Sequence, residues 1–118
     1  VPVLKDIQDK DRQALRETIN QFKKAAQEKS FTPDALKGAT LTLSNFGKFA
    51  GQFASPIVVP PAVAILGVGR LTQTPVVKNN TVTIGHLLPL SLTFDHRGVT
   101  GGEATRFLKT LMDSLSKP

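Results

Sequence analysis

Cysteine is absent from the 118-residue chain, and His86 and His96 are its only histidines. Without cysteine there is neither a disulfide framework nor a thiolate zinc site, and the protein cannot supply a thiol nucleophile. Zinc needs three or four ligands at suitable spacing, so we also expect no metal site. The longest apolar run, Ala62 to Val68, is far shorter than the ~20 residues of a membrane-spanning helix, which predicts a soluble protein.

Tyrosine and tryptophan are also absent, and no acidic residue occurs between Ala35 and Phe94. That stretch contains four basic residues, Lys37, Lys48, Arg70 and Lys78. Such a stretch would favour an anionic ligand, although scattered solubilising charges give the same pattern. A net charge of +6 also fits a nucleic-acid-binding domain, but the missing stacking aromatics and the lack of a binding motif argue against nucleic acid as a partner.

The length of the chain fits one domain of ordinary size or part of a larger one, and its apolar periodicity predicts both helices and strands. The run 62–69 is apolar on both faces and predicts a central, buried strand. Asn79 and Asn80 tolerate positive φ and predict a two-residue hairpin turn. The full set of expected elements is a strand end at 1–5, a helix at 9–29, a helical turn at 32–34, strands at 39–43, 62–69, 71–78, 81–87 and 88–94, a loop at 44–51, and a final helix after 100.

His96 lies in the predicted connection between the last strand and the final helix. A rigid strand and a capped helix can hold a loop side chain in a fixed orientation, and an imidazole exchanges protons near neutral pH. Thr100 and Glu103 match a capping box, which would fix the start of the helix. Without further information, His96 could equally be a loop histidine without a function. His86 follows Gly85 at a strand end and has no obvious partner, so we interpret it as structural.

The segment Phe94-Asp95-His96-Arg97-Gly98-Val99-Thr100-Gly101 resembles the signature of the dihydrolipoamide acyltransferases of the 2-oxo acid dehydrogenase complexes, which reads Asp-His-Arg, three further residues, then Gly. Three further segments resemble the same family in the same order: 41–47, 56–61 and 64–69. The likeness covers nearly the whole chain.

This resemblance implies acyl transfer between the thiols of dihydrolipoamide and coenzyme A, with His96 as the general base. Proton transfer from a thiol to an imidazole is uphill by about 2.7 kcal/mol, which a base acting during thiolate attack can supply. The resemblance makes Ser44 the hydroxyl donor to the oxyanion and places Ser44, Asn45 and Gly69 near coenzyme A. From the residues alone, Ser44 could instead bond its own backbone and Asn45 could be a turn residue.

Thr100 departs from the commonest family pattern, in which an aspartate or sometimes an asparagine follows the histidine by four positions. A threonine cannot form the ion pair attributed to that aspartate. Thr100 can still cap the final helix, so we expect a retained activity and a structural role for Thr100 in the catalytic loop. Arg97 is expected to anchor the loop rather than contact substrate.

The resemblance also implies a fold, an assembly and a location. The expected fold is a two-layer α/β sandwich like that of chloramphenicol acetyltransferase, in which helices pack on a mixed sheet. Residues 1–118 would form the C-terminal portion of one catalytic domain, which assembles as a homotrimer with active sites shared between neighbouring subunits and then into a larger core. Expected partners are a lipoyl domain carrying the lipoyl group, a decarboxylase and a dihydrolipoamide dehydrogenase, in a bacterial cytoplasm or, in a eukaryote, the mitochondrial matrix.

Two alternatives share this fold. A non-catalytic core subunit would keep the assembly without activity, and the departure at Thr100 fits that alternative, but the presence of both His96 and Ser44 favours an enzyme. A chloramphenicol-type acetyltransferase has related histidine chemistry, but Asp95-His96-Arg97 favours the lipoyl family. Which acyl group is carried, acetyl, succinyl or branched-chain, does not follow from the sequence.

Overall fold

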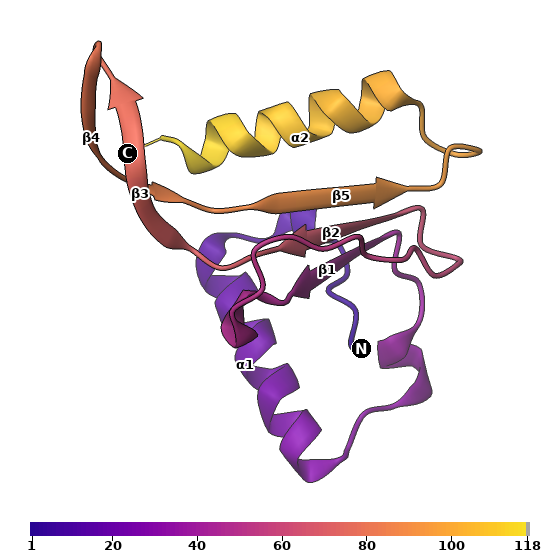
Figure 1. Cartoon of the computed structure of the whole chain (residues 1–118). Coiled ribbons are helices and arrows are strands. Elements are labelled where there is room, and N and C mark those ends of the chain that lie inside the picture. The colour runs from indigo at the N-terminus through magenta and orange to yellow at the C-terminus, as the bar shows by residue number, and fades with distance from the viewer. Residues whose placement is uncertain (118) are drawn as a thin grey trace. The chain divides into compact units, whose positions relative to one another are not determined.

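The computed structural model of the chain describes residues 1–117 (Figure 1). These residues form two compact units, Val1–Ala39 and a second that begins at Thr40. All of the residues expected to carry the function lie in the second unit. None of the helices in the described part of the chain has the length and apolar character of a membrane span.

The first unit contains the predicted amphipathic helix, α1 (Arg12–Glu28), between two 3-10 turns, η1 (Ile7–Asp9) and η2 (Pro33–Leu36). The helix is shorter than the predicted range 9–29, because the Asp11 side chain caps it by accepting a hydrogen bond from the Ala14 amide at 2.8 Å. The expected strand end at 1–5 is wrong. That segment is irregular and makes one backbone hydrogen bond, from the Val3 amide to the Ala35 carbonyl.

The second unit is built on a mixed three-stranded sheet. Its strands are β1 (Leu41–Asn45), β2 (Ala64–Val68) and β5 (Leu90–Phe94), in the order β1-β2-β5. β2 runs parallel to β1 and antiparallel to β5. The prediction of a central, buried strand is confirmed, since β2 lies in the middle and Ala64 and Leu66 are among the most buried residues.

The helix α2 (Gly101–Leu115) covers one face of this sheet, as Figure 1 shows along β5. Because side chains alternate across strands, the register places Leu92, Leu66 and Leu43 on one face and Ser91, Gly67 and Ser44 on the other. Ala104 of α2 is buried against the apolar face. A helix layer on a mixed sheet is the two-layer α/β sandwich that the family resemblance implied.

The predicted hairpin forms a separate two-stranded sheet from β3 (Thr72–Lys78) and β4 (Thr81–Leu87). Asn79 and Asn80 turn the chain with φ values of 53° and 57°, as the sequence predicted. Figure 1 shows this ribbon projecting from one end of the three-stranded sheet.

The boundaries of β1 differ from the prediction. The strand begins two residues later than expected and includes Ser44 and Asn45, which had been placed in a loop. Parallel pairing of these two residues with Gly67 and Val68 of β2 extends the strand to that point. The loop then contains a 3-10 turn, η3 (Gly47–Phe49). Pro60 and Pro61 lie in a turn just before β2.

Candidate active site

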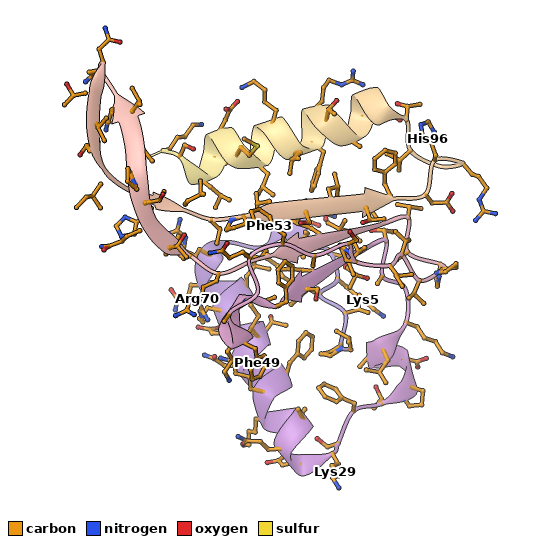
Figure 2. The ribbon with its side chains drawn as sticks, viewed as in Figure 1. Lys5, Lys29, Phe49, Phe53, Arg70 and His96 are labelled. Atoms are coloured by element: carbon orange, nitrogen blue, oxygen red, sulfur yellow. The ribbon has the colours of Figure 1, made fainter. Side chains whose placement is uncertain are left out.

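His96 lies in a tight, hydrogen-bonded loop between β5 and α2 (Figure 2). The amide of Asp95 donates to the Val63 carbonyl at 2.8 Å, which extends the pairing of β5 by one residue. The amides of Gly98 and Val99 both donate to the Asp95 carbonyl at 3.0 Å, which closes the loop. His96 is exposed, and the centroid of its ring lies 5.6 Å from that of Phe94. The strand and the loop thus hold the imidazole at the surface.

Asp95 and Arg97, which precede and follow His96, are joined by several hydrogen bonds. The Arg97 guanidinium donates from Nη2 to Asp95 Oδ2 at 2.7 Å and from Nε to Oδ1 at 3.0 Å, and the Arg97 amide donates to the same Oδ1. These bonds hold the pKa of Asp95 at about 2, with the Arg97 side chain as the largest cause. Arg97 therefore anchors the loop, as expected. The role of Asp95 was missed, although the Asp-x-Arg spacing could have indicated it.

Thr100 is committed to the start of α2. Its hydroxyl lies 2.7 Å from Glu103 Oε2, and the Glu103 amide donates back to the hydroxyl at 3.3 Å. The Thr100 amide donates to Glu103 Oε2 at 2.8 Å, and this bond, with that from the hydroxyl, lowers the pKa of Glu103. The predicted capping box is confirmed. The geometry gives the Thr100 hydroxyl the role of positioning the helix.

Ser44 and Asn45 lie at the far end of β1, where a glycine-rich loop crosses β2. The Asn45 Oδ1 accepts a hydrogen bond from the Gly47 amide at 3.0 Å, so the side chain does form a turn, the alternative considered from the sequence. The Phe46 amide continues the pairing with β2 by donating to the Val68 carbonyl at 3.1 Å. Ser44 itself is half-buried beside Gly67.

Gly69 is buried at the same end and is needed for packing. Its amide donates to the Pro89 carbonyl at 2.9 Å, and a Cβ atom on it would lie 2.5 Å from the Gln52 carbonyl oxygen. Gly47 in turn approaches the Gly69 carbonyl so closely that it also has no room for a side chain. The two glycines bring the loop after β1 onto the end of β2, where the Arg70 amide binds the Gly51 carbonyl at 2.8 Å.

The candidate residues form two groups at opposite ends of the sheet. Ser44 shares a row of the register with Gly67 and Ser91, whereas Phe94 shares a row with Ala64, three residues away. That separation is about 10 Å along the strands, and the two inter-strand spacings between β1 and β5 add about 10 Å across them. His96 lies beyond Phe94. Within one copy, Ser44 and His96 are therefore too far apart to act on the same atom.

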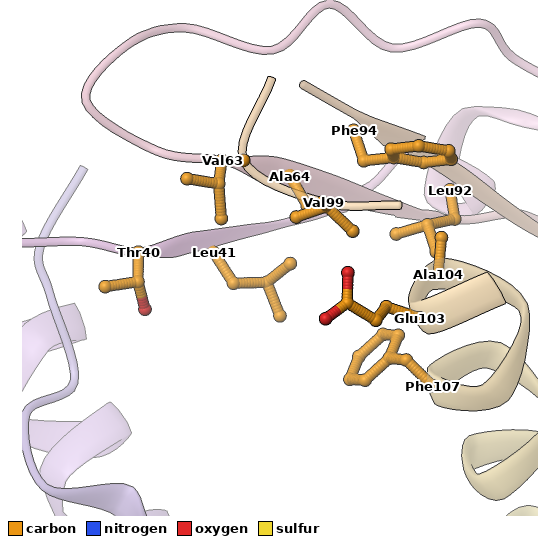
Figure 3. A pocket seen from close by; sticks show the side chains of 11 residues that line it. Thr40, Leu41, Val63, Ala64, Leu92, Phe94, Val99, Glu103, Ala104 and Phe107 are labelled. Atoms are coloured by element: carbon orange, nitrogen blue, oxygen red, sulfur yellow. The ribbon is translucent and has the colours of Figure 1, made fainter. Parts of the chain in front are cut away.

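A groove lies between the sheet, the end of the histidine loop and the start of α2 (Figure 3). It has a volume of about 330 Å³ and an apolar lining that includes Leu41, Ala64, Phe94 and Phe107. The capping carboxylate of Glu103 also lines it, but His96 does not. Among residues 1–117, no group of three or more His, Asp or Glu side chains gathers that could hold a metal ion.

Residues 1–118 match the family described as 2-oxoacid dehydrogenases acyltransferase (catalytic domain). The chain is 40% identical over 117 residues to the dihydrolipoyllysine-residue acetyltransferase component of the pyruvate dehydrogenase complex of Staphylococcus aureus, and 39% identical to that of Staphylococcus epidermidis. The match covers 97% of this chain and 27% of each relative. The chain thus spans about a quarter of the length of these curated relatives.

Solved structures that resemble this chain come from the same family. One is a structure of Azotobacter vinelandii dihydrolipoamide acetyltransferase, from a crystallographic and enzymatic investigation of a serine, a histidine and an asparagine in its catalytic mechanism. It aligns with a TM-score of 0.91 at 37% sequence identity, and the alignment covers 99% of this chain and 48% of that one. The truncated 2-oxoacid dehydrogenase core of Thermoplasma acidophilum gives 0.80 at 31% identity, covering 100% of this chain and 51% of that one. The chain belongs to the 2-oxoacid dehydrogenase acyltransferase family.

Proposed function

We propose that the chain is the C-terminal portion of a catalytic domain that transfers an acetyl group between dihydrolipoamide and coenzyme A within a 2-oxo acid dehydrogenase complex. The observation that carries this proposal is the presentation of His96, exposed and held between the Asp95–Arg97 ion pair and a capped helix. Acetyl is the proposed group because the relatives are named as acetyltransferases of pyruvate dehydrogenase complexes. The cofactor substrate is coenzyme A, and the lipoyl group arrives on a separate domain.

His96 acts as the general base in this mechanism. Its imidazole takes the proton of the incoming thiol as the sulfur attacks the thioester carbonyl, which forms a new C–S bond and a tetrahedral oxyanion. Collapse of the oxyanion breaks the original C–S bond, and the departing sulfur takes the proton back from the imidazolium. The proton taken from the attacking thiol thus ends on the departing thiol, and one C–S bond replaces another with no change of oxidation state. Such a base is worth about 10²–10⁴ in rate.

Ser44 donates its hydroxyl to the oxyanion, a contact worth about 10²–10³ in rate. Because Ser44 and His96 of one copy lie at opposite ends of the sheet, the serine of one subunit acts with the histidine of its neighbour. The Azotobacter vinelandii protein supports a role for both residue types, because its structure is described as an investigation of a serine, a histidine and an asparagine in the catalytic mechanism. In its numbering the serine and the histidine have the same separation as Ser44 and His96, and the asparagine follows the histidine by four positions, as Thr100 does here.

The end of the sheet that carries Ser44 fits an anionic substrate. Lys48 and Arg70 are both exposed there, on the two segments that Gly47 and Gly69 hold against each other. No acidic residue between Ala35 and Phe94 offsets their charge. We assign the binding of the coenzyme A phosphates to Lys48 and Arg70. Asn45 and Gly69 shape the approach to Ser44.

The direct test is His96→Ala in the full-length polypeptide, with acetyl-coenzyme A and dihydrolipoamide as substrates. The expected result is a loss of kcat of about 10²–10⁴-fold with an unchanged assembly. Arg106→Ala, an exposed change on α2 outside the loop, serves as the matched control and retains activity. A His96→Ala enzyme with wild-type kcat would instead favour the alternative, a non-catalytic core subunit of the same complex.

A further inference from the structure

The ring of Phe46 lies between two glycines that leave room for it. A Cβ atom on Gly67 would lie 2.8 Å from Phe46 Cε1, and one on Gly51 would lie 2.7 Å from Phe46 Cδ2. These two atoms belong to opposite edges of the ring, so the glycines contact it from both sides. Neither glycine has a positive φ, so the backbone conformation does not require glycine at either position. The space that the ring occupies accounts for both.

The register of the sheet places the ring next to Ser44. Ser44 pairs directly with Gly67, and paired residues of neighbouring strands point to the same side of the sheet, about 5 Å apart. Since the ring contacts the Cβ position of Gly67, it lies on the side of the sheet that carries the Ser44 side chain. The Phe46 backbone is fixed there as well, because its amide donates to the Val68 carbonyl at 3.1 Å.

An aromatic ring at this position limits the space beside the proposed oxyanion donor. In the proposed function, on which this step rests, the thioester oxygen lies about 3 Å from the Ser44 hydroxyl. The acyl chain is bonded to the same carbonyl carbon, so its first carbons lie near the ring. The pantetheine arm carries amide groups that need hydrogen-bond partners, which a phenyl ring does not supply. The apolar acyl chain is therefore the part of the substrate that fits against Phe46.

We propose that Phe46 determines which acyl groups the site accepts. Its ring forms an apolar wall beside Ser44 that leaves room for the methyl group of an acetyl thioester and excludes a branched chain. A single methylene group in an apolar pocket changes kcat/KM by about 10- to 200-fold, so one side chain is enough to set such a preference.

The test is Phe46→Ala in the full-length polypeptide, with acetyl-coenzyme A and isobutyryl-coenzyme A as donors to dihydrolipoamide. The ratio of kcat/KM for isobutyryl to that for acetyl is expected to rise at least tenfold. Phe46→Leu is a smaller change that should raise the ratio by less, and it provides the same test if the alanine variant does not fold. Phe49→Ala is the matched control, because Phe49 lies in the same loop and is 86% exposed. An unchanged ratio in the Phe46 variants would overturn the inference.

A stability measurement tests the position of the ring independently of catalysis. Gly67→Ala is expected to unfold at a lower urea concentration, because its methyl group meets the ring. Adding Phe46→Leu should restore part of that loss, since leucine has no atom at the position of Cε1, and a double-mutant cycle measures the coupling. Strictly additive effects of the two changes would place the ring elsewhere and reject the inference.

These outcomes are distinguishable from a failure of the proposed function. Loss of activity in His96→Ala together with an unchanged acyl ratio in the Phe46 variants rejects this inference and keeps the proposed function. Full activity in His96→Ala together with an altered acyl ratio rejects the role of His96 and keeps Phe46 as the residue that selects the acyl group.

Discussion

Ser44 and His96 occupy opposite ends of one three-stranded sheet: Ser44 lies three register rows and two strands from Phe94, and His96 lies beyond Phe94. Their separation follows from the strand directions: β1 runs parallel to β2 and ends at Ser44 and Asn45, while β5 runs the other way and delivers His96 past the beginning of β2. A proton acceptor and an oxyanion donor must both lie about 3 Å from the reacting atoms. A site built from these two residues therefore needs two copies of the chain.

Mixed assemblies provide the first prediction. Ser44→Ala and His96→Ala subunits, each impaired alone, are expected to recover activity when they are assembled together in equal amounts. In a random mixture about one quarter of the sites receive both an intact serine and an intact histidine, so about a quarter of the wild-type kcat per site should return. The measurement is acetyl transfer to dihydrolipoamide after co-expression.

The control for this experiment is the pair of variants mixed after separate assembly, which retains only the residual activity of each variant. No recovery in co-assembled mixtures would show that both residues act within one subunit, or that one of them does not act at all.

The basic residues beside Ser44 give the second prediction. Arg70→Gln and Lys48→Gln are each expected to raise the KM for coenzyme A about tenfold, since a charge-assisted contact to a phosphate is worth about 1.5 kcal/mol or more. The KM for pantetheine, which lacks the nucleotide phosphates, should not change. Lys78→Gln at the hairpin turn is the matched control. Equal effects on coenzyme A and pantetheine would contradict a phosphate contact.

Local patterns in the sequence predict most of this fold. The Asn79-Asn80 turn and the Thr100–Glu103 cap are encoded by residues close to one another, and both are present in the structure. The extent of β1 could not be predicted in the same way, because Ser44 and Asn45 become strand residues only through pairing with β2, about twenty residues later. The distance between Ser44 and His96 could not be predicted from local sequence either, because the order and direction of the strands determine it.

Thr100 carries the third prediction. Thr100→Ala is expected to lower the free energy of unfolding by about 1 kcal/mol, because α2 loses its capping hydroxyl. Since that hydroxyl binds Glu103, kcat should fall by less than about tenfold at a saturating substrate concentration, far less than for His96→Ala. Urea denaturation and steady-state kinetics measure the two effects. Thr100→Ser keeps the cap and should match the wild type, whereas a loss of kcat in Thr100→Ser would give the Thr100 methyl group a role.

The fourth prediction concerns the Asp95–Arg97 pair and pH. The folded-state pKa of Asp95, about 2, is below the value near 4 of an unfolded aspartate, so the pair stabilises the fold above about pH 4 and this contribution disappears as the pH falls toward 2. Asp95→Asn should therefore unfold at a lower urea concentration at pH 7, with a difference that shrinks in acid. Arg97→Gln should show the same trend. A constant difference at every pH would mean that the ion pair is not responsible.

The last prediction tests whether Gly69 acts through packing or through direct contact with the substrate. Gly69→Ala would place a methyl group 2.5 Å from the Gln52 carbonyl, and the backbone of the glycine-rich loop must move to relieve that contact. The expected cost is about 1–3 kcal/mol of unfolding free energy. Gly101→Ala is the matched control, because nothing lies within 4 Å of its Cβ position and alanine favours the first turn of α2. If Gly69→Ala keeps wild-type stability but raises the KM for coenzyme A, the glycine lines the substrate path directly. If the variant is destabilised and its loop is displaced, Gly69 acts by holding Lys48 and Arg70 beside Ser44.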